Sequence, residues 1–92
     1  MKVENMRNPR SGHSVPNQFL IIDGDFEYFQ SYRTIIVKID NTKGRFNQVV
    51  YLDGNWNCSK TTSKYRNQFL GETTKETKAK IASGEYILAD LN

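Results

Sequence analysis

The stretch Phe19-Leu20-Ile21-Ile22-Asp23-Gly24-Asp25-Phe26-Glu27-Tyr28-Phe29 decides the fold class of this chain. It contains two runs rich in aromatic and β-branched residues, which favour strands. An Asp-Gly dipeptide separates the runs, and glycine accepts a positive φ at little steric cost. This combination predicts a β-hairpin that turns at Asp23-Gly24, with Gly24 at positive φ.

Two further strands are expected after this hairpin. Residues 33–40 contain the β-branched series Thr34-Ile35-Ile36-Val37, and residues 46–52 contain Val49-Val50-Tyr51. The polar cluster Asn41-Thr42-Lys43-Gly44 between them is typical of a turn. Four consecutive strands with short connections predict an antiparallel meander, because neighbours in sequence usually pair in space.

From Ser59 onward the apolar spacing becomes that of a helix. Tyr65, Phe69 and Leu70 fall on one helical face. Ser59 suits the N-cap of this helix, and Gly71 suits the position just after its end. The preceding Trp56 is expected to be mostly buried, where a large ring can fill the joint between sheet and helix.

A second helix and a last strand complete the predicted order. Thr73-Thr74-Lys75-Glu76 has the spacing of a capping box, and the helix that it opens would run to Ala82. Ser83-Gly84 ends this helix, and residues 85–91 read as a strand. The predicted class is α+β, an antiparallel sheet of a four-strand meander plus a C-terminal strand, with two short helices in the order ββββααβ.

The predicted domain organisation is a flexible N-terminal arm, residues 1–16, followed by a single compact domain, residues 17–92. The arm is polar, has almost no apolar periodicity and lacks the apolar segment of a signal peptide. The longest apolar run, Ile35-Ile36-Val37, is far shorter than the roughly 20 residues that span a bilayer. The one cysteine cannot form an internal disulfide, which indicates a reducing compartment. We expect a cytoplasmic protein that does not bind membranes.

No catalytic, metal or cofactor site is predicted. The only histidine, His13, lies in the expected arm, and one histidine with one cysteine cannot supply a structural zinc site. Cys58 is near a helix start but has no positioned base, so an incidental cysteine is the favoured interpretation. Asp23 and Asp25 lack the further ligands of a calcium loop.

The aromatic residues Phe26, Tyr28, Phe29 and Tyr32 form the first candidate binding group. Strand alternation places Phe26 and Tyr28 on one face of the sheet and Phe29 on the other. Exposed aromatic rings on a sheet can stack on unpaired bases, but at least half of the group is expected to be core. Phe29 and Tyr32 are retained as candidate binding residues.

A basic segment forms the second candidate. Residues 54–92 carry six basic and four acidic side chains, most of the excess lies between Lys60 and Lys80, and the whole chain has a net charge of +3. Hydroxyls and cations at a helix start can hold an anion, but an ordinary capped first turn looks the same. The candidate binding residues here are Lys60, Lys64 and Arg66, with Lys60 and Lys64 on an exposed side and Arg66 toward its edge.

Three segments resemble a known family: Asn17-Gln18-Phe19, Phe29-Gln30-Ser31-Tyr32-Arg33-Thr34-Ile35-Ile36 and Trp56-Asn57-Cys58-Ser59-Lys60-Thr61-Thr62-Ser63-Lys64-Tyr65. The family consists of small uncharacterised proteins of bacteriophages and related mobile elements. The resemblance covers most of the chain from Asn17 onward, and the family often has Tyr at the place of Cys58. Because the family has no assigned activity, the resemblance implies an origin and carries over no functional residue.

These observations lead to three expected functions. The first is a non-enzymatic accessory protein that binds a host protein in the bacterial cytoplasm, for example to inhibit a defence system. The second is a nucleic-acid-binding module that uses the Lys60–Lys80 region. The third is a virion or assembly component that self-associates, and the exposed edges of a small sheet would allow a homodimer.

Overall fold

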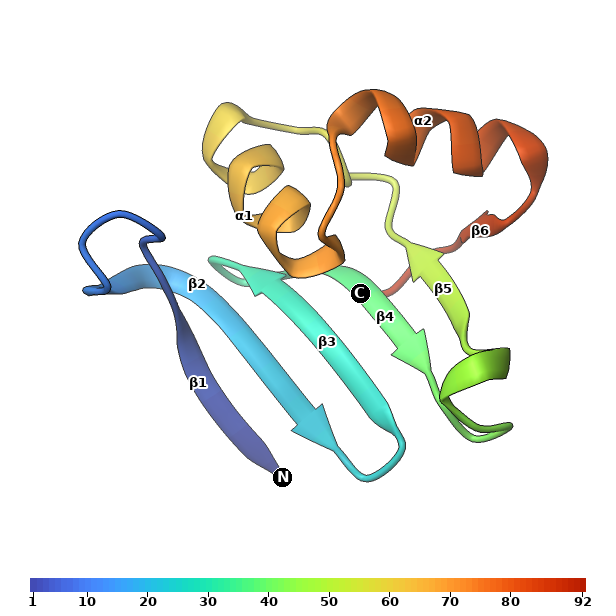
Figure 1. Ribbon diagram of the computed structural model, residues 1–92, viewed down its shortest axis with the longest axis horizontal. Helices are drawn as coiled ribbons and strands as arrows, with labels where there is room; N and C mark the ends of the chain where they lie inside the picture. The colour runs from blue at the N-terminus through green and yellow to red at the C-terminus, as the bar shows by residue number, and fades with distance from the viewer.

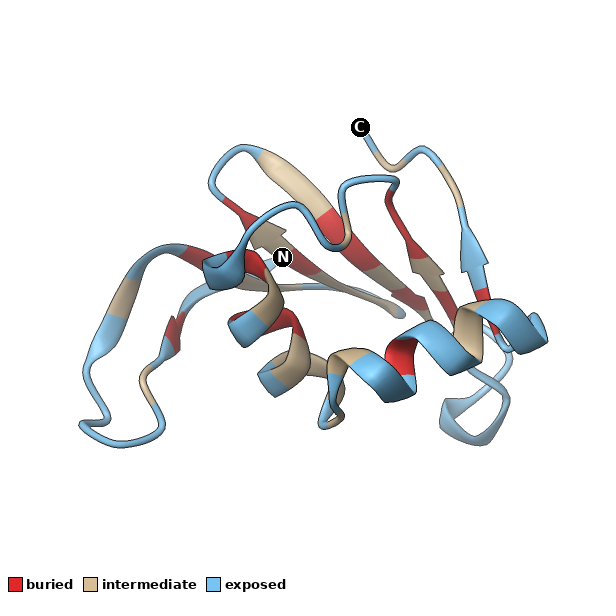
Figure 2. Cartoon of the chain, turned by 90° about the horizontal axis from the view of Figure 1, so that it is seen from above, coloured by how far each residue is buried: buried red, intermediate tan, exposed pale blue.

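Six strands form one sheet, in which strands consecutive in sequence are neighbours in space. The computed structural model describes residues 1–92. The elements are β1 Lys2–Arg7, β2 Ser14–Asp23, β3 Phe26–Ser31, β4 Thr34–Asp40, the 3-10 helix η1 Arg45–Asn47, β5 Val49–Leu52, α1 Lys60–Leu70, α2 Thr74–Ser83 and β6 Tyr86–Leu88. Both α-helices lie on the same side of the sheet (Figure 1, Figure 2). The predicted α+β class is confirmed.

Strands β1 to β5 are antiparallel, whereas β6 pairs parallel with β5, Tyr86 lying opposite Val50. The parallel pairing follows from the connection. Since α1 and α2 carry the chain over one face and back, β6 can enter the sheet in the same direction as β5. The helices are therefore the crossover between the last two strands (Figure 1).

The prediction of a flexible arm over residues 1–16 is wrong. Residues Lys2–Arg7 form β1, which pairs with β2 from Lys2 opposite Ile22 to Asn5 opposite Phe19. As an edge strand, β1 is ordered mainly by backbone hydrogen bonds. Its side chains are mostly polar, so its sequence shows no alternation of apolar residues that would predict a strand. Its one buried side chain is Met6, which belongs to the hydrophobic core.

Gly24 lies in the two-residue loop of the β2–β3 hairpin, with a φ of 59°. The predicted hairpin and the positive φ of Gly24 are confirmed, but the loop is Gly24-Asp25, because Asp23 still pairs with Phe26 as the last residue of β2. The fourth predicted strand is shorter than expected. Gly44, at a φ of 91°, instead opens the 3-10 turn η1, and the Phe46 side chain on this turn is fully exposed.

Both helices begin and end at the predicted caps. Ser59 Oγ accepts from the backbone N–H of Thr62 at 3.1 Å, and Thr73 and Glu76 form the reciprocal capping box. Gly71 and Gly84 follow the helices in left-handed conformations, with φ of 70° and 84°. These signals act within a few residues, which is why the sequence alone predicts them.

The core lies between the sheet and the helices. A register shift between β3 and β4 leaves Ile36 and Val37 both fully buried, although they are adjacent in sequence. Phe29 stacks on Phe69 of α1, with ring centroids 5.9 Å apart. Trp56 packs against this core but is only half-buried, so it is less buried than predicted.

Candidate functional site

Arg66 is fully buried, and its predicted place at the edge of the exposed basic side is wrong. Its guanidinium donates to the backbone carbonyl of Trp56 and, at 2.8 Å each, to Asn67 Oδ1 and Thr74 Oγ1. Its Cζ also lies 4.9 Å from the centre of the Trp56 ring. Burial lowers the pKa of Arg66, although Glu72 opposes this change. Arg66 is thus a structural cation that joins three segments.

The other two predicted cations are exposed, as expected. Lys60 and Lys64 line one shallow polar pocket on α1 together with Asn67, which confirms that the two lysines share a side of the helix. The Lys64 ammonium lies 5.3 Å from the Tyr65 ring centre. The Ser59 side chain already caps this helix start, so fewer backbone N–H groups remain for an anion.

The two predicted aromatic binding residues have different environments. Phe29 is fully buried, so it is not available to a partner. Tyr32 is 56% exposed at the tip of the β3–β4 hairpin, where its φ of 56° is unusual for a residue with a side chain. Its backbone N–H donates to the Asn17 carbonyl at 2.6 Å, and its own carbonyl accepts from Gln30 Nε2 at 2.8 Å. These contacts hold the strained turn in place.

The side of the sheet opposite the helices carries a group of apolar and aromatic side chains that are partly or fully exposed. We call this surface the open face. By strand register it comprises Val3, Phe19, Ile21, Phe26, Tyr28, Ile35, Lys38, Val49, Tyr51 and Ile87, none of which is buried. The open face thus spans the whole width of the sheet.

An aromatic cluster with one cation lies at the centre of the open face. Tyr28, Lys38 and Tyr51 are cross-strand neighbours on β3, β4 and β5. The Lys38 ammonium lies 4.9 Å from the Phe26 ring centre and 5.8 Å from that of Tyr51. Sequence alternation correctly placed Phe26 and Tyr28 opposite Phe29. It missed Lys38 and Tyr51, because only the strand register brings them to this place.

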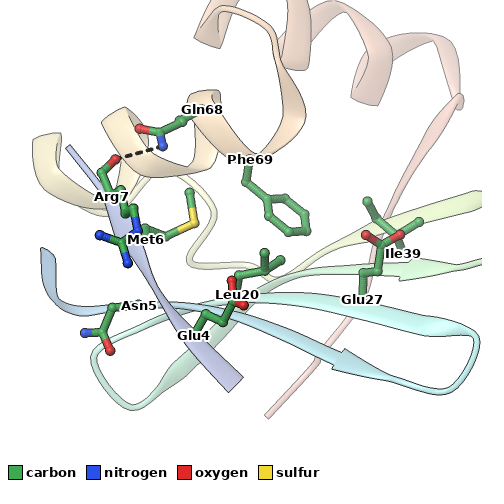
Figure 3. Close-up of a pocket in the computed structure, with 9 residues that line it drawn as sticks. All are labelled: Glu4, Asn5, Met6, Arg7, Leu20, Glu27, Ile39, Gln68 and Phe69. Atoms are coloured by element: carbon green, nitrogen blue, oxygen red, sulfur yellow. Dashed lines mark hydrogen bonds between the residues drawn. The ribbon is translucent and has the colours of Figure 1, made fainter. Parts of the chain in front are cut away.

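A cavity of about 370 Å³ opens on the other side of the sheet, where α1 leaves part of it uncovered (Figure 3). Its lining residues are Glu4, Asn5, Met6, Arg7, Leu20, Glu27, Ile39, Gln68 and Phe69. In Figure 3, Phe69 points from α1 toward Leu20, between Met6 and the Glu27 side chain. Gln68 Nε2 donates to the Arg7 carbonyl at 2.9 Å, which fixes α1 to β1 at one end of the cavity.

Three further observations concern metal binding, the cysteine and membrane crossing. The chain has no group of three or more His, Cys, Asp and Glu side chains placed to hold a metal ion. Cys58 is exposed, and its Sγ lies 3.7 Å from the Thr62 hydroxyl. Neither α-helix has the length and apolar character needed to cross a membrane.

The chain belongs to the family of unknown function DUF8033, whose model matches residues 1–85. The match includes β1 and the β1–β2 hairpin, so the N-terminal strand lies within the region that the family model covers. Comparison with curated proteins and with solved structures found no match. The match therefore assigns the chain to a family, but it gives no activity and no site residue.

Proposed function

We propose that this chain is a small accessory protein, encoded by a bacteriophage or related mobile element, that catalyses no reaction and binds a host protein in the bacterial cytoplasm. The binding surface in this proposal is the open face. The observation that carries it is the cluster of Phe26, Tyr28 and Tyr51 around Lys38 on an uncovered sheet. Extended apolar surface on a small protein is typical of an interaction site, and aromatic residues dominate the energetics of such sites.

The charges of the open face favour a protein partner over nucleic acid. Lys38 is its only cation, and the same side of the sheet carries Asp23 and Asp40. Hydrogen bonds from the Thr42 hydroxyl and backbone N–H lower the pKa of Asp40, so this carboxylate is charged at neutral pH. A surface that binds a phosphate backbone needs several cations. A protein interface of standard size needs about 800 Å² per partner, for which a six-stranded sheet offers a suitable platform.

A pull-down with a matched control tests this proposal. Tagged protein is incubated with bacterial lysate at about 0.15 M salt, where exposed charges are partly screened. The variant Tyr28→Ala/Tyr51→Ala removes two rings of the open face, and Lys60→Glu/Lys64→Glu changes only the exposed side of α1. We expect one stoichiometric host protein with wild type and with the lysine variant, and its loss with the tyrosine variant. The proposal is wrong if the folded tyrosine variant still captures it.

Nucleic-acid binding by the Lys60–Lys80 region is the second candidate, because Lys60 and Lys64 are exposed together in one polar pocket. Binding of this kind weakens steeply with salt, since each neutralised phosphate releases counterions. Fluorescence anisotropy with labelled single- and double-stranded DNA across a salt series measures this slope. Salt-dependent binding that Lys60→Glu/Lys64→Glu abolishes would favour this candidate over the open face.

A further inference from the structure

The cavity beneath α1 contains a carboxylate, that of Glu27, whose nearest neighbours on the sheet are apolar. Glu27 is half-buried on β3, and its cross-strand neighbours on the helix side of the sheet are Ile22 and Ile39. Leu20 and Phe69 complete the adjoining apolar wall. Glu27 is the second residue of β3, close to the hairpin, and folding removes part of its hydration. A partly buried charge of this kind is stabilised by an ionic partner.

Glu27 has no such partner within the chain. Its Oε2 accepts one hydrogen bond, from Asn41 Nδ2 at 2.9 Å. The three ion pairs of the protein involve Glu4, Glu72 and Glu85, and Glu27 takes part in none of them. Its other oxygen, Oε1, makes no hydrogen bond to the protein. Glu27 thus retains a free acceptor that faces the cavity system.

The position of Glu27 between two cavities makes this acceptor accessible. It is the one residue that lines both the cavity of about 370 Å³ and a neighbouring one of about 310 Å³. The second cavity is formed by Ile22, Gly24, Asp25, Glu27, Asn41, Gly44 and Arg45. A ligand in the larger cavity can therefore reach the Glu27 carboxylate while its remainder lies on the apolar wall.

The local charge is close to neutral once Lys2, the ion-pair partner of Glu4, is included. The two cavities together carry three carboxylates, Glu4, Asp25 and Glu27, and two guanidinium groups, Arg7 and Arg45. Glu4 is already paired with Lys2 at 2.9 Å, and Arg7 donates to the Gly12 carbonyl at 3.0 Å. The protein as a whole has a net charge of +3. The net charge of the region therefore does not repel a cation, and the free Oε1 of Glu27 is the group that would hold one.

We propose that the Glu27 cavity binds an organic cation, a guanidinium or ammonium group on a short aliphatic stem. A guanidinium group can donate two parallel hydrogen bonds to a carboxylate. The stem would pack on Leu20, and the Phe69 ring would lie beside the cation. The cavity volume is at the lower end of the range for small-ligand sites, which suits a group the size of an arginine or lysine side chain.

An NMR titration with two probes of the same shape tests the charge requirement. The probes are n-butylguanidinium and its neutral analogue n-butylurea. We expect n-butylguanidinium to give saturable shifts at the Met6 methyl and the Phe69 ring, with a Kd of about 1 mM, as is usual for a fragment of this size. n-Butylurea should bind at least about tenfold more weakly, because it is neutral and can donate hydrogen bonds to a carboxylate without forming an ion pair.

Variants and a salt series test whether Glu27 is the carboxylate that binds the guanidinium probe. Glu27→Gln should weaken n-butylguanidinium binding about tenfold or more, whereas the exposed and distant Glu85→Gln should leave it unchanged. If Glu27→Gln is poorly folded, a salt series on wild type replaces it. Raising the ionic strength should weaken the guanidinium probe and not the urea probe.

The same experiment distinguishes two sources of the cation. Binding of N-acetyl-arginine N-methylamide would point to an arginine side chain of a partner protein, and binding of n-butylguanidinium alone to a free small molecule. Equal affinity for the guanidinium and urea probes would overturn the proposal. So would undiminished binding of n-butylguanidinium to folded Glu27→Gln.

Discussion

The Tyr86 hydroxyl donates a 2.6 Å hydrogen bond to Oε1 of Glu72, and this contact ties the last strand to the turn between the two helices. The Glu72 side chain is only 4% exposed. The same carboxylate accepts from Lys80 Nζ at 2.9 Å and from Thr77 Oγ1 at 2.6 Å. Burial and the neighbouring Glu72 carboxylate raise the pKa of Tyr86 to about 12, so the phenol remains a donor at neutral pH.

This network predicts a pH dependence of stability. Burial alone would raise the pKa of Glu72, but hydrogen bonds from Thr77, Tyr86 and Lys80 outweigh it and lower the pKa below the ordinary value of 4.5. Because the folded pKa is the lower one, the stabilisation is fully present above the unfolded pKa and is lost as pH falls through the folded pKa. Glu72→Gln should therefore cost about 2–3 kcal/mol at pH 7 and flatten the acid dependence of the free energy of unfolding.

Urea unfolding between pH 3 and pH 7 measures both effects. Glu85→Gln is the matched control, because Glu85 lies 3.8 Å from the same Lys80 but is 62% exposed. We expect the control to change stability by less than about 0.5 kcal/mol. Some acid dependence should persist in Glu72→Gln, since backbone N–H groups of Leu91 and Asn55 overcome the effect of burial and lower the pKa of Asp53 as well. An unchanged slope in Glu72→Gln would contradict the prediction.

The β2–β3 hairpin depends on the positive φ of Gly24. Gly24→Val should destabilise the fold by more than about 1 kcal/mol, because a β-branched residue resists this conformation. Space is not the obstacle, since a Cβ at Gly24 would meet no atom within 4 Å. Gly54 also has free space but lacks a positive φ, so Gly54→Val is the control and should cost less. Thermal unfolding followed by circular dichroism compares the two, and equal melting temperatures would refute the turn's role.

Met6 and Val3 provide a test of whether β1 is part of the folded domain. Met6 is buried in the core, whereas Val3 on the same strand is 56% exposed on the open face. Met6→Ala should cost about 2–4 kcal/mol, since it leaves a cavity between β1 and α1. Val3→Ala should stay within about 0.5 kcal/mol. Chemical unfolding would show the difference, and two neutral variants would support a flexible arm instead.

The parts of the fold that sequence predicted are those specified within a few residues. The Gly24 turn and the Thr73–Glu76 capping box are local signals, and both are present as expected. The strand β1 could not be recognised in this way, because its order depends on the backbone of β2 rather than on its own apolar pattern. The same limit applies to Phe46, whose aromatic ring suggested a strand but lies on an exposed turn.

The candidate sites depend on contacts between distant segments, so the sequence located them less well. Alternation showed which aromatic residues share a face of β3, but Tyr51 joins Tyr28 only through the register of β4 and β5. The Glu27 cavity is built from β1 to β4 together with α1. Nothing near Glu27 in the sequence distinguishes it from an ordinary exposed glutamate.

Arg66 is another residue whose role depends on contacts between distant segments, and its substitution is a strong test of the fold. In the sequence it resembles Lys60 and Lys64, yet its guanidinium is buried and donates to Trp56, Asn67 and Thr74. Arg66→Lys keeps the charge but cannot reproduce the planar set of donors. We expect it to cost about 3–5 kcal/mol, because a buried charge and several acceptors lose their partners.

The Lys60→Glu/Lys64→Glu variant is the control for Arg66→Lys. Both lysines are exposed, so each change should stay within about 0.5 kcal/mol. Urea unfolding gives the free energies, and Trp56 fluorescence reports the local contact, since Arg66 Cζ lies 4.9 Å from that ring. Arg66→Lys should change the emission of the native state, and the lysine variant should not. If Arg66→Lys unfolds at the same urea concentration as wild type, its guanidinium is not the structural link between Trp56 and Thr74.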